Sequence, residues 1–214
     1  KGLQLYAVSD VKTPPLLVGD ALRLRQILDN LVGNAIKFTF SGHVAIRLQV
    51  MGDSEDGTDL RFQVQDTGIG IDPEQQPFLF DPYFRAHAAT QQQVQGAGLG
   101  LSICLRLGQE MGGRLTAASQ PGLGTCVSFE LRLPREPAAG YGPAPRLLPQ
   151  TVYVDGAIPE VVHNLCAWLR HWGAMAQPYR DQVQSLKEQA VLVQAWPRSV
   201  RRVQWTGKCV LALG

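Results

Sequence analysis

The chain has 214 residues, 45% of them hydrophobic, and a formal net charge of +2. This length accommodates one complete domain and a smaller one, and the hydrophobic content is sufficient for real cores. The small net charge gives no reason to expect nucleic-acid binding. The sequence has no run of about eighteen apolar residues and no signal peptide at its start, which predicts a soluble, intracellular protein without a membrane segment in this chain.

A first strand is predicted over 3–8, followed by a helix over 22–38, where apolar residues recur at three- and four-residue steps. Asp20 is placed to cap this helix through its carboxylate. At about 100° per residue, four polar residues project within an arc of about 80°: Gln26, Asn30, Asn34 and Lys37. Such a face usually meets solvent, but two amides and a lysine on the side of the glycine-rich segments described next favour a binding role.

Two half-buried strands are predicted over 44–50 and 60–66, joined by an acidic, flexible loop at 52–57 to which we assign no role. Asp66 ends the second strand, where a carboxylate is costly to bury without a hydrogen-bonding partner. An adenine amino group would be such a partner. Gly68 and Gly70 would then let the backbone approach the base or adopt a positive φ, which a residue with a Cβ atom would hinder.

The sequence Asp-Pro-Glu-Gln-Gln at 72–76 predicts a helix start, and the glutamine-rich stretch 88–95 predicts a mobile lid. A helix is expected over 99–111, and its glycine-rich beginning suits a phosphate cradle because it presents unpaired N–H groups and a positive dipole end. Strands at 115–118 and 127–133 complete a sheet.

Four ordered motifs within residues 1–134 resemble the catalytic ATP-binding domain of sensor histidine kinases, in the GHKL ATPase superfamily. The four motifs are the N box at 30–39, the G1 box at 66–71, the F box at 80–84 and the G2 box at 96–101. In addition, 122–125 fits the element that closes the adenine pocket. The stretch 19–28 is closest to the hybrid kinases. The resemblance implies an α/β (α+β sandwich) architecture, a Bergerat-type ATP-binding fold with helices on one face of a mixed sheet.

The resemblance also implies ATP and Mg²⁺ as cofactors and assigns roles to individual residues. Asn30, Asn34 and Lys37 form the expected catalytic set, with Asn34 as the Mg²⁺ ligand. The expected ATP-binding residues are Asn34, Lys37, Asp66, Gly68, Gly70, Ile71, Phe84, Arg85, Gly96, Gly98, Leu99, Gly100, Leu101 and Thr125. Arg85 is expected to reach either the γ-phosphate or the acceptor domain, although a solvent-exposed arginine fits equally well.

Asn30 bears on the reaction, because hydrolysing relatives place a glutamate there to activate water and an amide cannot accept that proton. The sequence therefore favours phosphoryl transfer to a protein histidine and predicts slow intrinsic hydrolysis. His43, His87, His163 and His171 all lack the acceptor motif. The acceptor is expected on a dimerisation hairpin of the same protein, preceding residue 1, with a response regulator or receiver domain as a further partner.

The segment 135–150 is proline-rich and predicts a linker. Residues 151–214 alternate between strand and helix patterns, which suggests a parallel sheet. They loosely resemble part of a receiver domain, but only Asp155 occupies an expected acidic position and the third strand ends without a carboxylate. We interpret this part as a degenerate, partial receiver that acts as a docking or spacing module or merely as a structural appendage. The four cysteines are expected to be reduced core thiols.

Three hypotheses follow from these observations. The favoured one is the ATP-binding kinase domain of a hybrid sensor histidine kinase, forming the cytoplasmic part of a bacterial inner-membrane protein. The second is a hydrolysing GHKL ATPase, which Asn30 opposes. The third is a nucleotide-binding or scaffold module without kinase activity, which the complete N, G1 and G2 boxes oppose.

Overall fold

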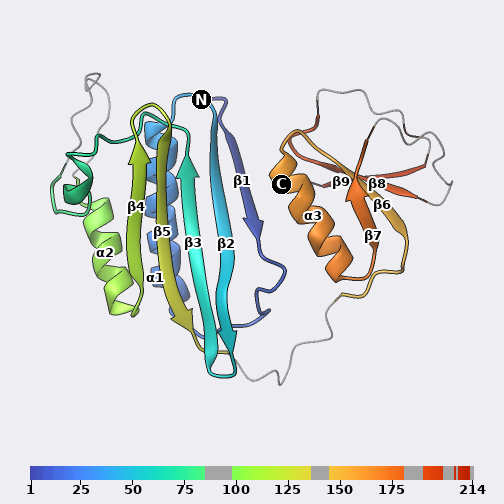
Figure 1. Ribbon diagram of the computed structural model, residues 1–214, viewed down its shortest axis with the longest axis horizontal. Coiled ribbons are helices and arrows are strands. Elements are labelled where there is room, and N and C mark those ends of the chain that lie inside the picture. Colours follow the sequence, from blue (N-terminus) through green and yellow to red (C-terminus); the bar gives the residue numbers. More distant parts are fainter. Residues whose placement is uncertain (85–97, 136–144, 181–189, 200–204, 206, 213–214) are drawn as a thin grey trace. The chain divides into compact units, whose positions relative to one another are not determined.

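The computed structural model in Figure 1 describes residues 1–84, 98–135, 145–180, 190–199, 205 and 207–212. The chain divides into two compact units. The first comprises residues 1–5 and 12–137, and the second comprises residues 6–11 and 138–214.

A five-stranded sheet in the order β1-β2-β3-β5-β4 forms the framework of the first unit, except that residues 6–9 of β1 are grouped with the second unit. The strands are β1 (Gln4–Ser9), β2 (His43–Ser54), β3 (Gly57–Asp66), β5 (Gly124–Leu133) and β4 (Arg114–Gln120). The pairs β2–β3, β3–β5 and β4–β5 are antiparallel, and Figure 1 shows β1 and β2 running in the same direction. The sheet is therefore mixed, as the resemblance implied.

Two helices, α1 (Ala21–Phe38) and α2 (Gly100–Glu110), pack on one face of this sheet. Asp20 Oδ1 accepts a hydrogen bond from Arg23 N at 3.0 Å, which confirms the predicted cap of α1. The apolar face of α1 buries Ile27 and Leu31 in a core that contains the fully buried Phe129 of β5. Burial of an aromatic side chain of this size contributes about 2–3 kcal/mol.

Two predictions for this unit were wrong in detail. The acidic segment 52–57 is mostly strand, and only residues 55–56 form the turn, because polar side chains pair across the hairpin: Thr58 Oγ1 donates to Asp53 Oδ1 at 2.7 Å. The expected helix at 72–76 is reduced to a turn followed by the 3-10 helix η1 (Gln76–Phe78). Pro77 has no N–H to donate, which limits regular helix at this point.

The second unit contains a four-stranded parallel sheet in the order β7-β6-β8-β9, which confirms the predicted parallel pairing. Its elements are β6 (Thr151–Asp155), α3 (Pro159–His171), β7 (Met175–Pro178), β8 (Val191–Ala195) and β9 (Lys208–Ala212). Val152 and Val154 pack against Val162 and Cys166 of α3. The predicted helix at 182–189 lies outside the described residues.

The cysteine prediction holds only in part. Cys104 and Cys166 are buried free thiols, whereas Cys126 is half-buried and Cys209 is exposed. Cys126 lies opposite the non-core residue Gln65, on the face of the sheet away from the helices, since core and non-core positions alternate along a strand.

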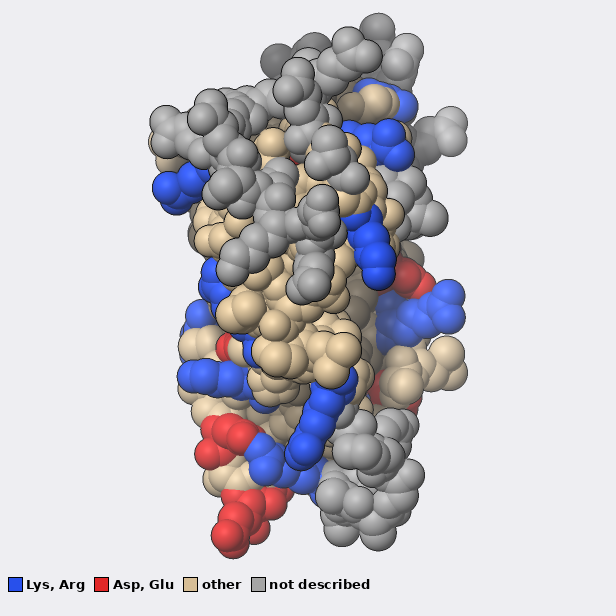
Figure 2. Space-filling model, turned by 90° about the vertical axis from the view of Figure 1, so that its right-hand side faces the viewer, with Lys and Arg blue, Asp and Glu red and all other residues tan. Residues whose placement is uncertain are grey.

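None of the helices in the described part of the chain has the length and apolar character that crossing a bilayer requires. On the face shown in Figure 2, Lys and Arg side chains are spread over the surface rather than gathered in one continuous patch, as expected for a net charge of +2.

Candidate functional site

Asp66 ends β3 with a side chain that is only 8% exposed. Its Oδ1 accepts hydrogen bonds from Gly68 N at 2.8 Å and from Thr125 N at 3.2 Å. Burial raises the pKa of this carboxyl, and the two backbone hydrogen bonds oppose the rise. Within the described residues, no group donates a hydrogen bond to Oδ2. Every fully buried side-chain nitrogen or oxygen among these residues has a hydrogen-bond partner, so Oδ2 is not fully buried. Oδ2 is therefore open to a donor from a ligand.

A hydroxyl network fixes the neighbourhood of this carboxylate. Ser119 Oγ accepts from Ile71 N at 2.8 Å and lies 2.8 Å from Thr125 Oγ1. Gln76 Nε2 donates to the carbonyls of Ile71 and Ser119 at 3.0 and 2.8 Å. Sequence reasoning missed Ser119 and Gln76, because neither belongs to a motif and only strand pairing brings β4 next to the G1 segment.

Gly70 has a backbone conformation that requires glycine. Its φ is +69°, and a Cβ atom there would lie 2.0 Å from Gln120 O. Gly68 is also confined, since a Cβ atom would lie 2.5 Å from Phe38 O at the end of α1. The G1 segment therefore packs between the β4–β5 turn and the C-terminal end of α1. The positive φ of Gly70 is one of the two roles predicted for these glycines, and their contact with a base stays a prediction.

The amides of α1 meet the beginning of α2. Both Asn30 and Asn34 are half-buried. A Cβ atom at Gly100 would lie 3.6 Å from Asn30 Oδ1 and 3.8 Å from Asn34 Nδ2. Asn30 also hydrogen-bonds the thiol of Cys104, whose pKa is raised to about 11 chiefly by burial. The thiol therefore remains protonated at neutral pH, and its Sγ donates to Ile27 O of α1 at 3.8 Å.

Among the described residues, none accepts a hydrogen bond from the backbone N–H groups of residues 100–102, which open α2. Leu99 is its N-cap and makes no side-chain capping hydrogen bond. The N–H groups of a first helical turn have no acceptor within the helix, and together with the positive end of the helix dipole they favour an anion. They lie beside the amides of Asn30 and Asn34, which is the arrangement that the phosphate-cradle prediction requires. Leu101, by contrast, packs against the core.

Tyr83 and Phe84 of the F box adjoin the other side of this turn, and Phe78 of η1 lies next to Phe84. The rings of Phe78 and Phe84 are 6.1 Å apart, and Tyr83 N donates to Gly98 O at 3.1 Å. The predicted lid at 88–95, together with Arg85 and Gly96, lies outside the described residues. Lys37 is half-buried near the end of α1, with its ammonium 5.2 Å from the centre of the Phe38 ring.

The described residues contain no group of three His, Cys, Asp or Glu side chains that would hold a metal by themselves. A half-buried amide such as that of Asn34 suits a different kind of site, in which Mg²⁺ takes one protein oxygen and completes its octahedral shell with phosphate oxygens and water. The side chains present therefore fit a metal that arrives with a phosphorylated ligand.

Comparisons with known proteins match this geometry. Residues 19–135 match the family described as histidine kinase-, DNA gyrase B- and HSP90-like ATPase. Sensor histidine kinase GacS of Pseudomonas protegens is 42% identical over 156 residues, covering 72% of this chain and 17% of that protein. Sensor histidine kinase RcsC of Escherichia coli is 40% identical over 134 residues, covering 63% of this chain and 13% of that protein.

A crystal structure of full-length ShkA in complex with AMPPNP superposes with a TM-score of 0.70 and 27% identity, covering 98% of this chain and 44% of that one. The chain spans less than a fifth of the length of the curated relatives reported above. Its similarity to them is therefore that of one part of a larger protein.

Proposed function

The chain belongs to the family of histidine kinase-, DNA gyrase B- and HSP90-like ATPases, and on that premise we propose that it binds Mg-ATP and forms the catalytic part of a hybrid sensor histidine kinase. The observation that carries this proposal is the carboxylate of Asp66, with one oxygen held by two backbone N–H groups and the other open to a ligand. Relatives named sensor histidine kinases supply the reaction class.

The purine end of the nucleotide would be read by Asp66. Its Oδ2 accepts a hydrogen bond from the exocyclic amino group of adenine, which guanine and hypoxanthine lack at that ring position. The two N–H groups on Oδ1 keep the carboxylate in one orientation, so the acceptor is preorganised. Thr125 and Ile71 would border the base, and Ser119 holds both in place.

The triphosphate end would lie between the α1 amides and the first turn of α2. Bound Mg²⁺ would neutralise phosphate charge and fix the γ-phosphoryl group, with the amide oxygen of Asn34 as its protein ligand. Lys37 adds a positive charge near the phosphates, and the N–H groups around Gly98 and Gly100 stabilise the charge that develops during transfer.

The reaction that fits these groups is in-line phosphoryl transfer to a histidine. The bond between the γ-phosphorus and the β–γ bridging oxygen breaks, a phosphorus–nitrogen bond forms, and ADP leaves. Asn30 occupies the position at which a carboxylate would activate water, and its amide cannot accept a proton, so hydrolysis is slow. The acceptor histidine belongs to a dimerisation hairpin of the full-length protein in the cytoplasm, and a response regulator or receiver domain takes the phosphoryl group next.

The second unit has a different role in this proposal. We assign residues 151–214 a degenerate receiver fold, following a linker at 135–150 and a catalytic domain at 1–134. The third strand in sequence order, β8, ends at Ala195 without a carboxylate, and Ser199 Oγ donates to Asp155 Oδ2 at 2.7 Å. The described part of this unit therefore does not supply the acidic set that accepts a phosphoryl group in receivers.

Calorimetric titration of residues 1–214 with Mg-AMPPNP tests nucleotide binding, with Asp66→Asn as the informative variant. The variant's carbonyl oxygen would accept from Gly68 and Thr125, which turns its NH₂ group toward the base. We expect AMPPNP affinity to fall by about tenfold or more, because a donor then faces a donor. Affinity for ITP, which presents an acceptor at that ring position, is expected to fall less or to rise.

Asp59→Asn is the matched control, since Asp59 lies on the same strand and pairs with the exposed Arg132 at 3.0 Å. It should leave the affinity for both nucleotides unchanged. Failure of the wild-type chain to bind Mg-AMPPNP up to millimolar concentration would falsify the proposal. Phosphoryl transfer is tested separately by adding the upstream hairpin in trans with labelled ATP, and rapid release of inorganic phosphate without hairpin labelling would instead indicate a hydrolase.

A further inference from the structure

The second unit contains a hollow of about 360 Å³ that the proposed ATP site does not use. It is lined by Tyr153 of β6, Arg170 of α3, Gln177 and Pro178 of β7, and Arg180 just beyond β7. Tyr153 and Gln177 are directly paired in the parallel ladder between β6 and β7. The hollow therefore lies at the edge-strand side of this sheet, and all of its lining belongs to one compact unit.

Two guanidinium groups share this hollow, and neither forms an ion pair with any described residue. Arg170 is oriented, because its Nε donates to Ala176 O at 2.6 Å on the edge strand. That bond leaves the two terminal nitrogens of the guanidinium to other acceptors. Two arginines placed together without a carboxylate partner are the arrangement that binds phosphate, since each guanidinium donates two parallel hydrogen bonds to it.

The aromatic side of the hollow is equally well fixed. The Tyr153 ring is 6.3 Å from the Tyr179 ring and 5.8 Å from the Trp205 ring, in edge-to-face contacts. Tyr179 and Trp205 also contact each other at 6.3 Å, and Trp205 Nε1 donates to Lys208 O at 2.8 Å. Because the three rings contact one another, the Tyr153 ring forms a rigid apolar surface beside the guanidinium groups of Arg170 and Arg180.

We propose that Arg170, Arg180 and Tyr153 form a second binding site, for a small phosphorylated ligand that carries a planar ring, such as a nucleotide. The arginines bind the phosphate, and the tyrosine contacts the ring. The volume suits a ligand of this size, because small-molecule sites commonly occupy about 300–1,000 Å³. This proposal does not depend on ATP binding by the first unit.

The two parts of the ligand can be tested separately on the full chain with three probes: GMP, inorganic phosphate and guanosine. GMP is suitable because it lacks the amino group that Asp66 would read. We expect GMP to bind most tightly, phosphate more weakly and guanosine weakest. Trp205 contacts Tyr153, so tryptophan fluorescence should change with GMP, and calorimetry gives the affinity.

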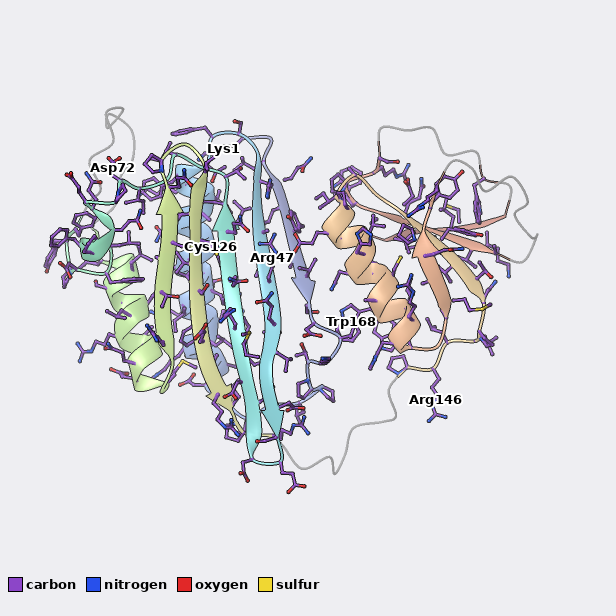
Figure 3. All side chains as sticks on the ribbon, in the orientation of Figure 1. Lys1, Arg47, Asp72, Cys126, Arg146 and Trp168 are labelled. Atoms are coloured by element: carbon purple, nitrogen blue, oxygen red, sulfur yellow. The ribbon has the colours of Figure 1, made fainter. Side chains whose placement is uncertain are left out.

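Arg180→Ala and Arg170→Ala should each weaken GMP binding by about tenfold or more, and Arg180→Lys should recover part of the loss. Arg146→Ala is the matched control, since it removes the same charge from the same unit outside the hollow, and Figure 3 shows Arg146 pointing away from the sheet. The Arg180 side chain is exposed, so its loss should leave the melting temperature unchanged.

The proposal is overturned if the wild-type chain binds neither GMP nor phosphate at millimolar concentration, or if both arginine variants bind GMP as Arg146→Ala does. The same variants titrated with Mg-AMPPNP separate the two sites. Loss of GMP binding with normal AMPPNP binding places the ligand in the second unit, whereas GMP binding that is lost only in an Asp66 variant places it in the first and contradicts the proposal.

Discussion

The two ends of the proposed ATP site are built in different ways. At the purine end, Asp66, Ser119 and Thr125 come from three paired strands, and backbone N–H groups fix the carboxylate. At the phosphate end, side-chain amides of α1 meet the first turn of α2. A site made of backbone hydrogen bonds couples ligand affinity to stability, whereas a site made of helix-surface side chains can change its chemistry with little effect on the fold.

Gly70→Ala should have the largest effect on stability, because it distorts the backbone at the purine end. The substitution places a Cβ atom 2.0 Å from Gln120 O at a φ of +69°. We expect a loss of about 3 kcal/mol or more in the free energy of unfolding, measured by urea denaturation, since the left-handed conformation and the clash add. AMPPNP binding should disappear with it.

The control for that experiment is Gly33→Ala, in the middle of α1, where a Cβ atom would meet nothing within 4 Å. Alanine there should raise the stability by about 0.5–1 kcal/mol, because it favours helix. Equal destabilisation of both variants would mean that the tight turn at Gly70 is not a special feature of this site.

Asn34→Ala, at the phosphate end, should weaken AMPPNP binding with little effect on the stability of the fold. With its metal ligand removed, the chain should lose about tenfold or more in AMPPNP affinity in the presence of Mg²⁺, but little in the presence of EDTA. The stability should change by less than about 1 kcal/mol, because the side chain lies outside the core. Gln26→Ala, an exposed amide on the same helix, is the control. An Asn34 variant with an unchanged response to Mg²⁺ argues against this residue as the ligand.

The same contrast explains what the sequence could and could not predict. The apolar spacing of α1 and the Asp20 cap are local patterns, and both were correct. The positions of Asn30 and Asn34 on one face followed from helix geometry alone. Ser119 could not be identified, because its role depends on the register of β4 against β5 and on the approach of Ile71, which are set by long-range packing.

The stability of Asp66→Asn at different pH values tests how ligand affinity and stability are coupled at the purine end. Burial raises the pKa of this carboxyl in the folded chain, so folding favours the protonated form. The stability that protonation contributes is present at low pH and is lost as the pH rises through the folded-state pKa. The neutral asparagine should therefore make the ligand-free chain more stable than wild type at about pH 7, by on the order of 1 kcal/mol, with little difference below about pH 4. Urea denaturation at both pH values measures this.

An asparagine variant that is less stable than wild type at neutral pH would show that the two backbone hydrogen bonds outweigh the desolvation of the carboxylate. Together with the affinity loss expected for AMPPNP, a stability gain would show that the negative charge is retained for ligand binding at a cost to the fold.

Ser119→Ala should have the smallest effect on AMPPNP affinity, and it tests whether the hydroxyl network matters to the ligand. The substitution removes three hydrogen bonds, which join Ser119 Oγ to Ile71 N, Gly124 O and Thr125 Oγ1. We expect a loss of about 1–2 kcal/mol in stability, because all three bonds are lost, and only a severalfold loss in AMPPNP affinity, because Ser119 acts on the ligand through its neighbours. Ser128→Ala removes a comparable hydroxyl from the other face of the sheet, where Ser128 accepts from Gln63 at 3.2 Å. That control should change stability without changing affinity, and equal affinities for the two variants would mean that the purine end is held by Asp66 and the backbone alone.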